Sequence, residues 1–178
     1  MVIVTRQEHA DAIDWLRKRD NEALARFVAS LALHDGPIGE QVCTFIVGDD
    51  LKATSDDLEQ RIHSMRKPPP RSRHEFGREV GQRLMFVLDA IETLVLPKDP
   101  QRAFDLLVLV IQHDGDAMEN CGDHHFEVSV AIDRAIELIA RVAPAVSRDV
   151  VRMELRSLTE SDGYGTRSKL NAMLAESS

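Results

Sequence analysis

The chain of 178 residues is 43% hydrophobic and 4% aromatic, a balance that fits a single folded domain over residues 1–178 and excludes a disordered or fibrous chain. Its formal net charge of −8 disfavours general binding to nucleic acid or anionic membranes, because phosphate contacts need Lys and Arg. The two cysteines, Cys43 and Cys121, form no CxxC pattern, which is usual in a reducing compartment.

The beginning of the chain shows no secretory signal, since MVIVTRQEH turns polar after four residues. The longest nearly apolar run, Leu106–Ile111, is far too short to cross a bilayer. We therefore expect a cytoplasmic protein that does not enter the membrane.

Apolar residues near the start of the chain recur at helical spacing. Thr5 and Glu8 can form the capping box of a first helix. Asn21 can cap a second helix, and Gly36-Pro37 would end it. The apolar positions of this second helix recur at intervals of three and four: Leu24, Phe27, Val28 and Leu31.

A proline run divides the chain. Before it we expect a short helix that stops near Gly48 and a fourth helix over ATSDDLEQRIHSM, with acids in its first turn. Pro68–Pro70 then breaks any helix. We therefore predict a Pro/Arg-rich linker over 67–73, between helical parts that span 5–66 and 74–175.

The second helical part predicts longer helices. The longest begins at His74. Asp99-Pro100 is a good N-cap and first-position pair for the next helix, which we expect to continue to about Asn120. Asp123 can cap the helix after that.

The end of the chain completes the pattern. Ser147 opens a last amphipathic segment, and a short tail helix follows. No stretch alternates with period two, so we predict an all-α fold of eight or nine helices, in antiparallel hairpins stacked as a short α-solenoid. The tripeptide His-Asp-Gly occurs at His34–Gly36 and again at His113–Gly115. The distance between the two copies along the chain is about twice the length of a forty-residue helical repeat.

The stretch QHDGDAMENCGDHHFE, residues 112–127, holds three histidines, one cysteine and five carboxylates. Its spacing favours the end of one helix and the start of the next. The alternative is a metal-dependent hydrolase with these ligands: His113, Asp116, His124 and Glu127. Adjacent histidines on a helix point about 100° apart, so only one of His124 and His125 could bind the ion.

Two further metal hypotheses fit less well. A calcium loop that starts at Asp114 would place Met118 at a ligand position. The His-Asp pairs also resemble those of HD-type phosphohydrolases, with His34-Asp35 as the central pair, His9 upstream, and Asp114 or Asp133 downstream. Gly-Pro directly after this pair ends the helix, which does not suit that pattern.

Residues 61–83, which we call the basic segment, carry seven basic and two acidic side chains. Arginine forks onto carboxylate or phosphate, so an acidic partner can dock here. Tyr164, the only tyrosine, lies between two glycines and is a further candidate contact. The predicted partner-binding residues are Arg66, Lys67, Arg71, Arg73 and Tyr164. The alternatives are a solvated linker and a nucleic-acid accessory protein, although the segment lacks interleaved aromatics.

The segments VLDAIETLV, PQRAFDLLVLVIQHDGDAMENCGD and ESDGYGTRSKL resemble a bacterial family of uncharacterised helical-repeat proteins, over residues 20–170. Relatives of that family sometimes occur beside SWIM-type zinc-finger modules. The resemblance implies an α-solenoid and supplies no catalytic residues. The chain departs from the family at Asp123-His124-His125, where small acidic and glycine residues are usual, and it has no zinc-finger cysteine pattern.

We therefore expect a helical-repeat scaffold for protein–protein interaction, with no catalytic residues and no cofactor. Its expected partner is an acidic protein of unknown identity. A homodimer is compatible with the exposed end repeats of a short solenoid.

Overall fold

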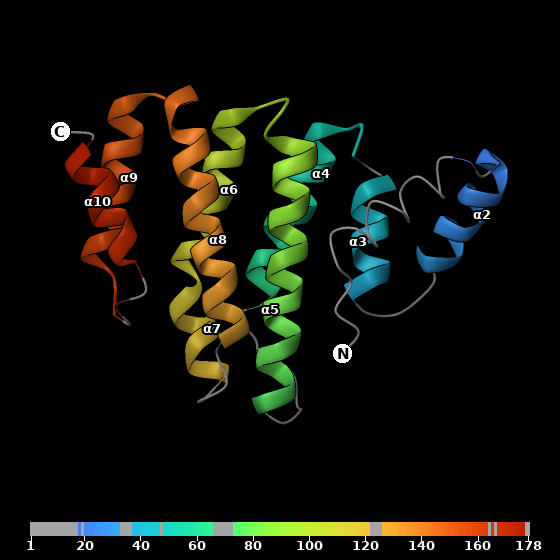
Figure 1. Ribbon diagram of the computed structural model, residues 1–178, viewed down its shortest axis with the longest axis horizontal. Helices are drawn as coiled ribbons and strands as arrows, with labels where there is room; N and C mark the ends of the chain where they lie inside the picture. The colour runs from blue at the N-terminus through green and yellow to red at the C-terminus, as the bar shows by residue number, and fades with distance from the viewer. Residues whose placement is uncertain are drawn as a thin grey trace. The chain divides into compact units, whose positions relative to one another are not determined.

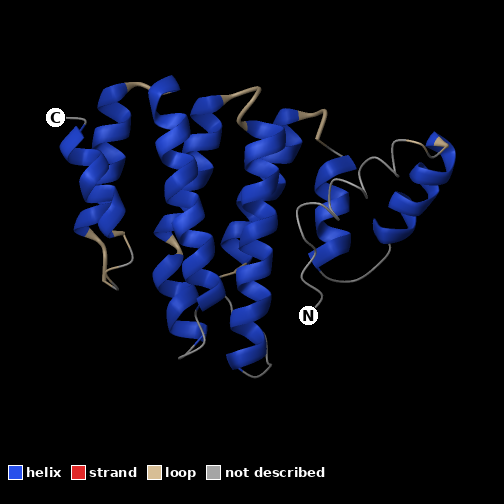
Figure 2. Ribbon diagram, in the orientation of Figure 1, coloured by secondary structure: helices blue, strands red, loops and turns tan. Residues whose placement is uncertain are grey.

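The computed structural model describes residues 18, 20–32, 37–46, 48–65, 73–121, 126–163, 165 and 167–176. These residues form helices and turns and include no strand, which confirms the all-α prediction (Figure 2). The chain divides into two compact units, which we call the N-terminal unit (1–42) and the C-terminal unit (43–178). Thr5, Glu8 and most of the linker predicted over 67–73 lie outside the described residues.

The N-terminal unit contains α2, Asn21–Ala32, and the first residues of α3, Pro37–Ile46. Pro37 begins α3, where its missing N–H costs nothing because the first helical N–H groups have no partner inside the helix. Phe27 and Val28, which the sequence places on an apolar face, are 57% and 39% exposed. These two apolar side chains of α2 are therefore exposed.

In the C-terminal unit, α4 spans Leu51–Ser64. Asp50 caps it, since its Oδ1 accepts a hydrogen bond from the backbone N–H of Ala53 at 3.0 Å. The helix therefore starts earlier than predicted, and its first turn contains no acid, which corrects the expectation for ATSDDLEQRIHSM.

Among the described residues the longest helix is α5, Arg73–Ala90, and a π turn, η1 (Ile91–Val95), follows it directly. Next comes α6, Pro100–Gln112. Its N-cap is Asp99, as predicted: Oδ1 accepts from the backbone N–H of Arg102 at 2.9 Å. Pro100 occupies the first helical position.

The helix after Asp99 was expected to continue to about Asn120, and this prediction is wrong. The structure ends α6 at Gln112, with His113 as its C-cap, and starts α7 at Asp114 (Asp114–Cys121). A buried ion pair at Asp114, described below, accounts for the break. Phe126–Val142 form α8, a short 3-10 turn η2 covers Ala143–Ala145, and α9 and α10 span Arg148–Glu160 and Ser168–Glu176.

Helices α5 and α8 form the centre of the C-terminal unit, and Figure 1 shows them side by side. α8 also packs against α6, and α6 packs against α4. α9 packs against α10. α6 is buried over most of its circumference, as expected for a central helix: Ala103, Phe104, Leu106, Leu107, Val108, Val110 and Ile111. Stacking as an α-solenoid stays a prediction. Among the described residues, no helix is both long and apolar enough to span a bilayer.

Candidate functional site

The predicted partner-binding residues are largely outside the described part of the chain. Arg66, Lys67, Arg71 and Tyr164 are not described, and Arg73 is placed only as the first residue of α5. The basic segment and Tyr164 therefore stay predictions.

A buried ion pair joins two of the segments that the sequence singled out. Arg167, just before α10, donates from Nε to Asp114 Oδ2 at 2.9 Å and from Nη2 to Asp114 Oδ1 at 2.5 Å. The two side chains are only 4% and 3% exposed. Because Asp114 begins α7, this pair links the stretch 112–127 to the turn that follows α9.

All five N–H groups of the Arg167 guanidinium have acceptors. Besides Asp114, Nη1 donates to the carbonyl of Leu158 at 2.7 Å and to the hydroxyl oxygen of Ser161 at 2.8 Å, and Nη2 donates to the carbonyl of Ile111 at 2.8 Å. The two carbonyls lie in the last turns of α9 and α6, where helix carbonyls lack partners within the helix. Arg167 thus closes two helix ends while it neutralises a buried carboxylate, which is a structural role.

Both downstream aspartates of the HD-type hypothesis are held by cations. Asp114 is bound by Arg167, and Oδ1 of Asp133 lies 2.8 Å from Nζ of Lys169. The hydrogen bond to Asp133 raises the pKa of Lys169 above its ordinary value. These two carboxylates connect the C-terminal end of the chain to α7 and α8. His34 and Asp35 lie outside the described residues.

His113 faces a second histidine, His63, which the sequence did not connect with it. Nε2 of His113 lies 3.1 Å from Nδ1 of His63, and the ring planes meet at 63°. The outer nitrogen of each ring faces a carboxylate oxygen at 3.8 Å: that of His63 faces Glu59, and that of His113 faces Asp116. We call these four residues the acid–histidine line.

The acid–histidine line is partly open to solvent, since the side chains of His63 and His113 are 47% and 14% exposed. Glu59 is fixed at its other oxygen, where Oε2 accepts a hydrogen bond from Nη2 of Arg102 at 2.5 Å. Glu59 also borders a polar hollow of about 270 Å³, together with Arg102, Asp105, Gln112 and Glu154. Solvent and small solutes can therefore reach one end of the line.

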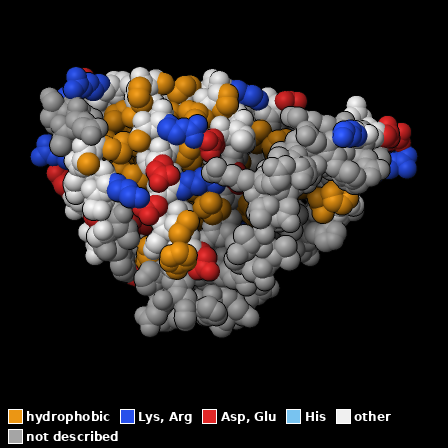
Figure 3. All heavy atoms as spheres, in the orientation of Figure 1, with side chains coloured by type: hydrophobic (Ala, Val, Ile, Leu, Met, Phe, Trp, Pro, Cys, Tyr) orange, Lys and Arg blue, Asp and Glu red, His pale blue; other side chains and the backbone are white. Residues whose placement is uncertain are grey.

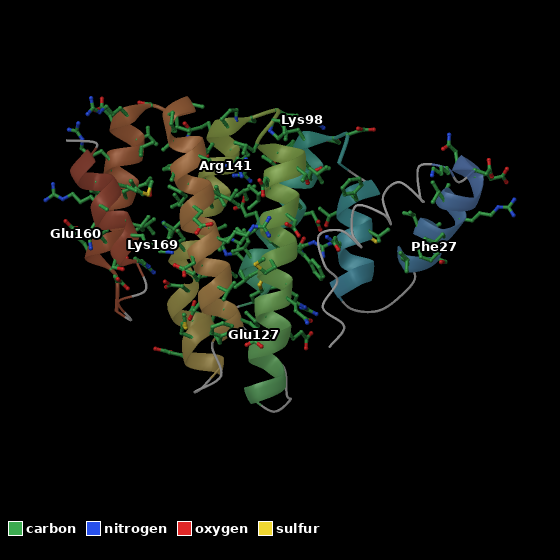
Figure 4. The ribbon with its side chains drawn as sticks, viewed as in Figure 1. Phe27, Lys98, Glu127, Arg141, Glu160 and Lys169 are labelled. Atoms are coloured by element: carbon green, nitrogen blue, oxygen red, sulfur yellow. The ribbon has the colours of Figure 1, made fainter. Side chains whose placement is uncertain are left out.

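The metal ligands predicted over 113–127 are only partly brought together. His113 and Asp116 are neighbours, whereas Glu127 stands at the start of α8, close to Gly81 of α5 (Figure 4). Within the described residues, no three His, Cys, Asp or Glu side chains form a group that could hold a metal ion. His124 lies outside the described residues, so this ligand set stays a prediction.

An apolar hollow of about 470 Å³ lies where α8 passes through η2 into α9, and we call it the α8–α9 hollow. Its lining consists mostly of small and medium apolar side chains: Ala140, Ala143, Pro144, Val146, Val151 and Met173, with Arg148 as the charged member. Figure 3 shows apolar side chains gathered along the upper edge of the visible face, over this part of the chain.

The π turn carries a carboxylate that receives two arginines from α8. Nη2 of Arg134 donates to Glu92 at 3.0 Å and to Asp89 at 2.5 Å, and Arg141 also donates to Glu92. The bonds from Arg141 and then Arg134 hold the pKa of Glu92 below its ordinary value. Burial lowers the pKa of Arg134, but its bonds to Asp89 and Glu92 outweigh this and raise it. This network joins α5 and η1 to α8.

Comparison of the chain with protein-family models, curated proteins and solved structures gives no match.

Sequence reasoning missed Arg167 and His63 because each acts on a partner far along the chain. Arg167 lies 53 residues from Asp114, and His63 lies 50 residues from His113. The local signals are weak. Arg167 is one basic residue after a glycine-rich turn, and His63 is one histidine in the last turn of an amphipathic helix.

Proposed function

We propose that the protein is a helical interaction module that binds an acidic partner protein and takes an apolar anchor of that partner into the α8–α9 hollow. The hollow is the observation that carries this proposal. Interfaces gain most of their affinity where a few anchor side chains fill well-packed pockets. At about 470 Å³ the hollow has room for a large side chain and part of the adjoining backbone.

We expect the partner to be acidic because this protein carries cations near the surfaces that the partner would contact. Arg148 lies in the wall of the hollow, and the basic segment concentrates seven cations in an otherwise acidic chain. A partner with carboxylates beside its apolar anchor is attracted to both places. Arg66, Lys67, Arg71, Arg73 and Tyr164 are the proposed contacts outside the hollow.

A second apolar surface supports an interaction role. On α8, Phe126 is 75% exposed, and Val130, one turn later, is 42% exposed. Neighbouring exposed apolar side chains of this size are typical of surfaces that another protein covers. The α-solenoid arrangement, the cytoplasmic location and the relation to the bacterial helical-repeat family belong to the same proposal.

Peptide display tests this proposal. A random peptide library would be selected on the wild-type protein, and enriched peptides would be measured against Ala143→Trp, which places an indole ring in the hollow. Ala145→Trp is the matched control, because Ala145 is exposed and lies just outside the lining.

We expect peptides with an apolar residue next to Asp or Glu. Their affinity should fall at least about tenfold in Ala143→Trp, since an obstructed pocket removes an anchor contact of about 1.4 kcal/mol or more. It should be unchanged in Ala145→Trp. Peptides without acids, or peptides that bind equally to both variants, would contradict the proposal.

A further inference from the structure

We infer that His63 and His113 form a two-histidine binding site for a divalent transition-metal ion, apart from the interaction surface proposed above. The site combines residues from α4 and from the junction of α6 and α7. It shares only His113 and the neighbouring Asp116 with the ligand set predicted from the sequence.

The distance between the facing nitrogens suits a shared ion. An ion that binds two imidazoles at 2.0–2.1 Å in tetrahedral geometry holds their nitrogens about 3.3 Å apart. Nδ1 of His63 and Nε2 of His113 are 3.1 Å apart. The two nitrogens would need to separate by only about 0.2 Å to reach that spacing.

The flanking carboxylates suit the tautomers that a metal ion needs. Without an ion, the inner nitrogens share one hydrogen bond at 3.1 Å, in which one ring donates and the other accepts. An ion bound there would need a lone pair from each inner nitrogen, so each ring would carry its proton on the outer nitrogen. Glu59 and Asp116 lie 3.8 Å from the outer nitrogens, too far for a hydrogen bond, and their negative charge favours a proton on that side.

With the proposed ion bound, the groups would follow the order carboxylate, histidine, ion, histidine, carboxylate. Metal-bound histidines commonly donate their other N–H to a carboxylate, which fixes the ring and makes the ligand more basic. Arg102 in turn holds Glu59 at 2.5 Å. The acid–histidine line would thus provide two histidine ligands for the ion and the two carboxylates that orient them.

Ligand type decides which ion binds. Imidazole nitrogen suits Zn²⁺, Cu²⁺ and Ni²⁺, whereas Mg²⁺ and Ca²⁺ need oxygen ligands. Among the divalent ions, Cu²⁺ should bind most tightly. Because no third His, Cys, Asp or Glu joins the pair within the described residues, water would complete the coordination. The exposed side of His63 admits it.

The test is calorimetric titration of tag-free protein with Cu²⁺, Zn²⁺ and Mg²⁺ at neutral pH. Variants His63→Ala and His113→Ala remove the proposed ligands, and Glu59→Gln removes an orienting carboxylate. His124→Ala is the matched control, because it removes a histidine of the sequence-predicted set. Circular dichroism would check that each variant is folded, and electron paramagnetic resonance of the Cu²⁺-loaded wild type would count the bound imidazoles without any substitution.

We expect one Cu²⁺ per chain with two imidazole nitrogens, weaker Zn²⁺ binding and no Mg²⁺ binding. Each ligand variant should bind Cu²⁺ more than about tenfold more weakly, Glu59→Gln about tenfold more weakly, and His124→Ala like the wild type. The inference is wrong if the wild type binds no Cu²⁺, which would leave an ordinary hydrogen bond as the whole interaction between the two rings. It is equally wrong if His63→Ala binds as the wild type does, or if His124→Ala loses the ion.

Discussion

Arg167 and Asp114 lie 53 residues apart in the chain and meet as a buried, two-pronged ion pair in the fold. The pair connects the junction of α6 and α7, where Asp114 lies, to the segment after α9, where Arg167 lies. The Asp114 carboxylate accepts two of the guanidinium N–H groups, and the carbonyls of Ile111 and Leu158 and the hydroxyl of Ser161 accept the other three. The junction and this segment are therefore parts of one structural joint that fixes the ends of α6 and α9.

Replacing Arg167 should destabilise the fold severely. Arg167→Met removes the buried cation that pairs with the Asp114 carboxylate, and it also removes the guanidinium donors to the carbonyls of Ile111 and Leu158. We expect the free energy of unfolding to fall by about 3–5 kcal/mol in urea titrations. Arg156→Met is the control, because Arg156 forms an exposed pair with Glu160 on α9 and its loss should cost less than about 0.5 kcal/mol. Similar losses in the two variants would contradict the structural role of Arg167.

The sequence predicted the elements whose signals are local. The pattern Asp99-Pro100 located the start of α6 because the cap and the proline act within one turn. The break at His113 was missed because α6 ends where Asp114 turns toward Arg167, a contact that no local pattern encodes.

The acid–histidine line was missed for the same physical reason. A helix end and a helix junction, 50 residues apart in the chain, meet only after α4 packs against α6. From the sequence, His113 is predicted to share a metal site with His124, which lies nearby in the chain. The structure places its partner, His63, on α4.

Stability should depend on pH through Glu92. The hydrogen bonds from Arg141 and Arg134 lower its pKa in the folded state below the ordinary value of 4.5. This stabilisation is therefore complete above pH 4.5 and is lost as the pH falls through the lowered pKa. We expect Glu92→Gln to cost about 1 kcal/mol at pH 7. In denaturation at a series of pH values, the difference from the wild type should shrink below pH 4.5. A difference that stays constant down to pH 2 would show that the charge of Glu92 is unimportant.

A glycine sets the approach of α5 to α8. A Cβ added at Gly81 would lie 2.5 Å from Cβ of Glu127 and 2.9 Å from its backbone carbonyl carbon, so α8 must shift. Gly81→Ala gains about 1 kcal/mol of helix propensity, yet we expect a net loss of about 1–3 kcal/mol in thermal or urea unfolding. Gly163→Ala should stay within about 0.5 kcal/mol of the wild type, since nothing lies within 4 Å of its added Cβ. A stabilised Gly81→Ala variant would mean that the two helices are not in close contact.

Two helix N-caps offer a matched comparison. The Asp99 side chain accepts a hydrogen bond at the start of α6, whereas the Ser147 side chain makes no capping bond at the start of α9. Asp99→Ala should therefore lower the free energy of unfolding by about 1 kcal/mol. Ser147→Ala should change it much less. Urea titration of both variants checks this, and equal losses would contradict the assigned caps.

The most direct test of the joint between α6, α7 and α9 is a double-mutant cycle on its two charged residues. Unfolding free energies would be measured for Arg167→Met, Asp114→Leu and the variant with both substitutions. Because each single substitution removes the buried charge that pairs with the other, we expect the double variant to lose at least about 2 kcal/mol less than the two single losses combined. Single losses that simply add, to within about 0.5 kcal/mol, would show that Arg167 and Asp114 do not act as a pair.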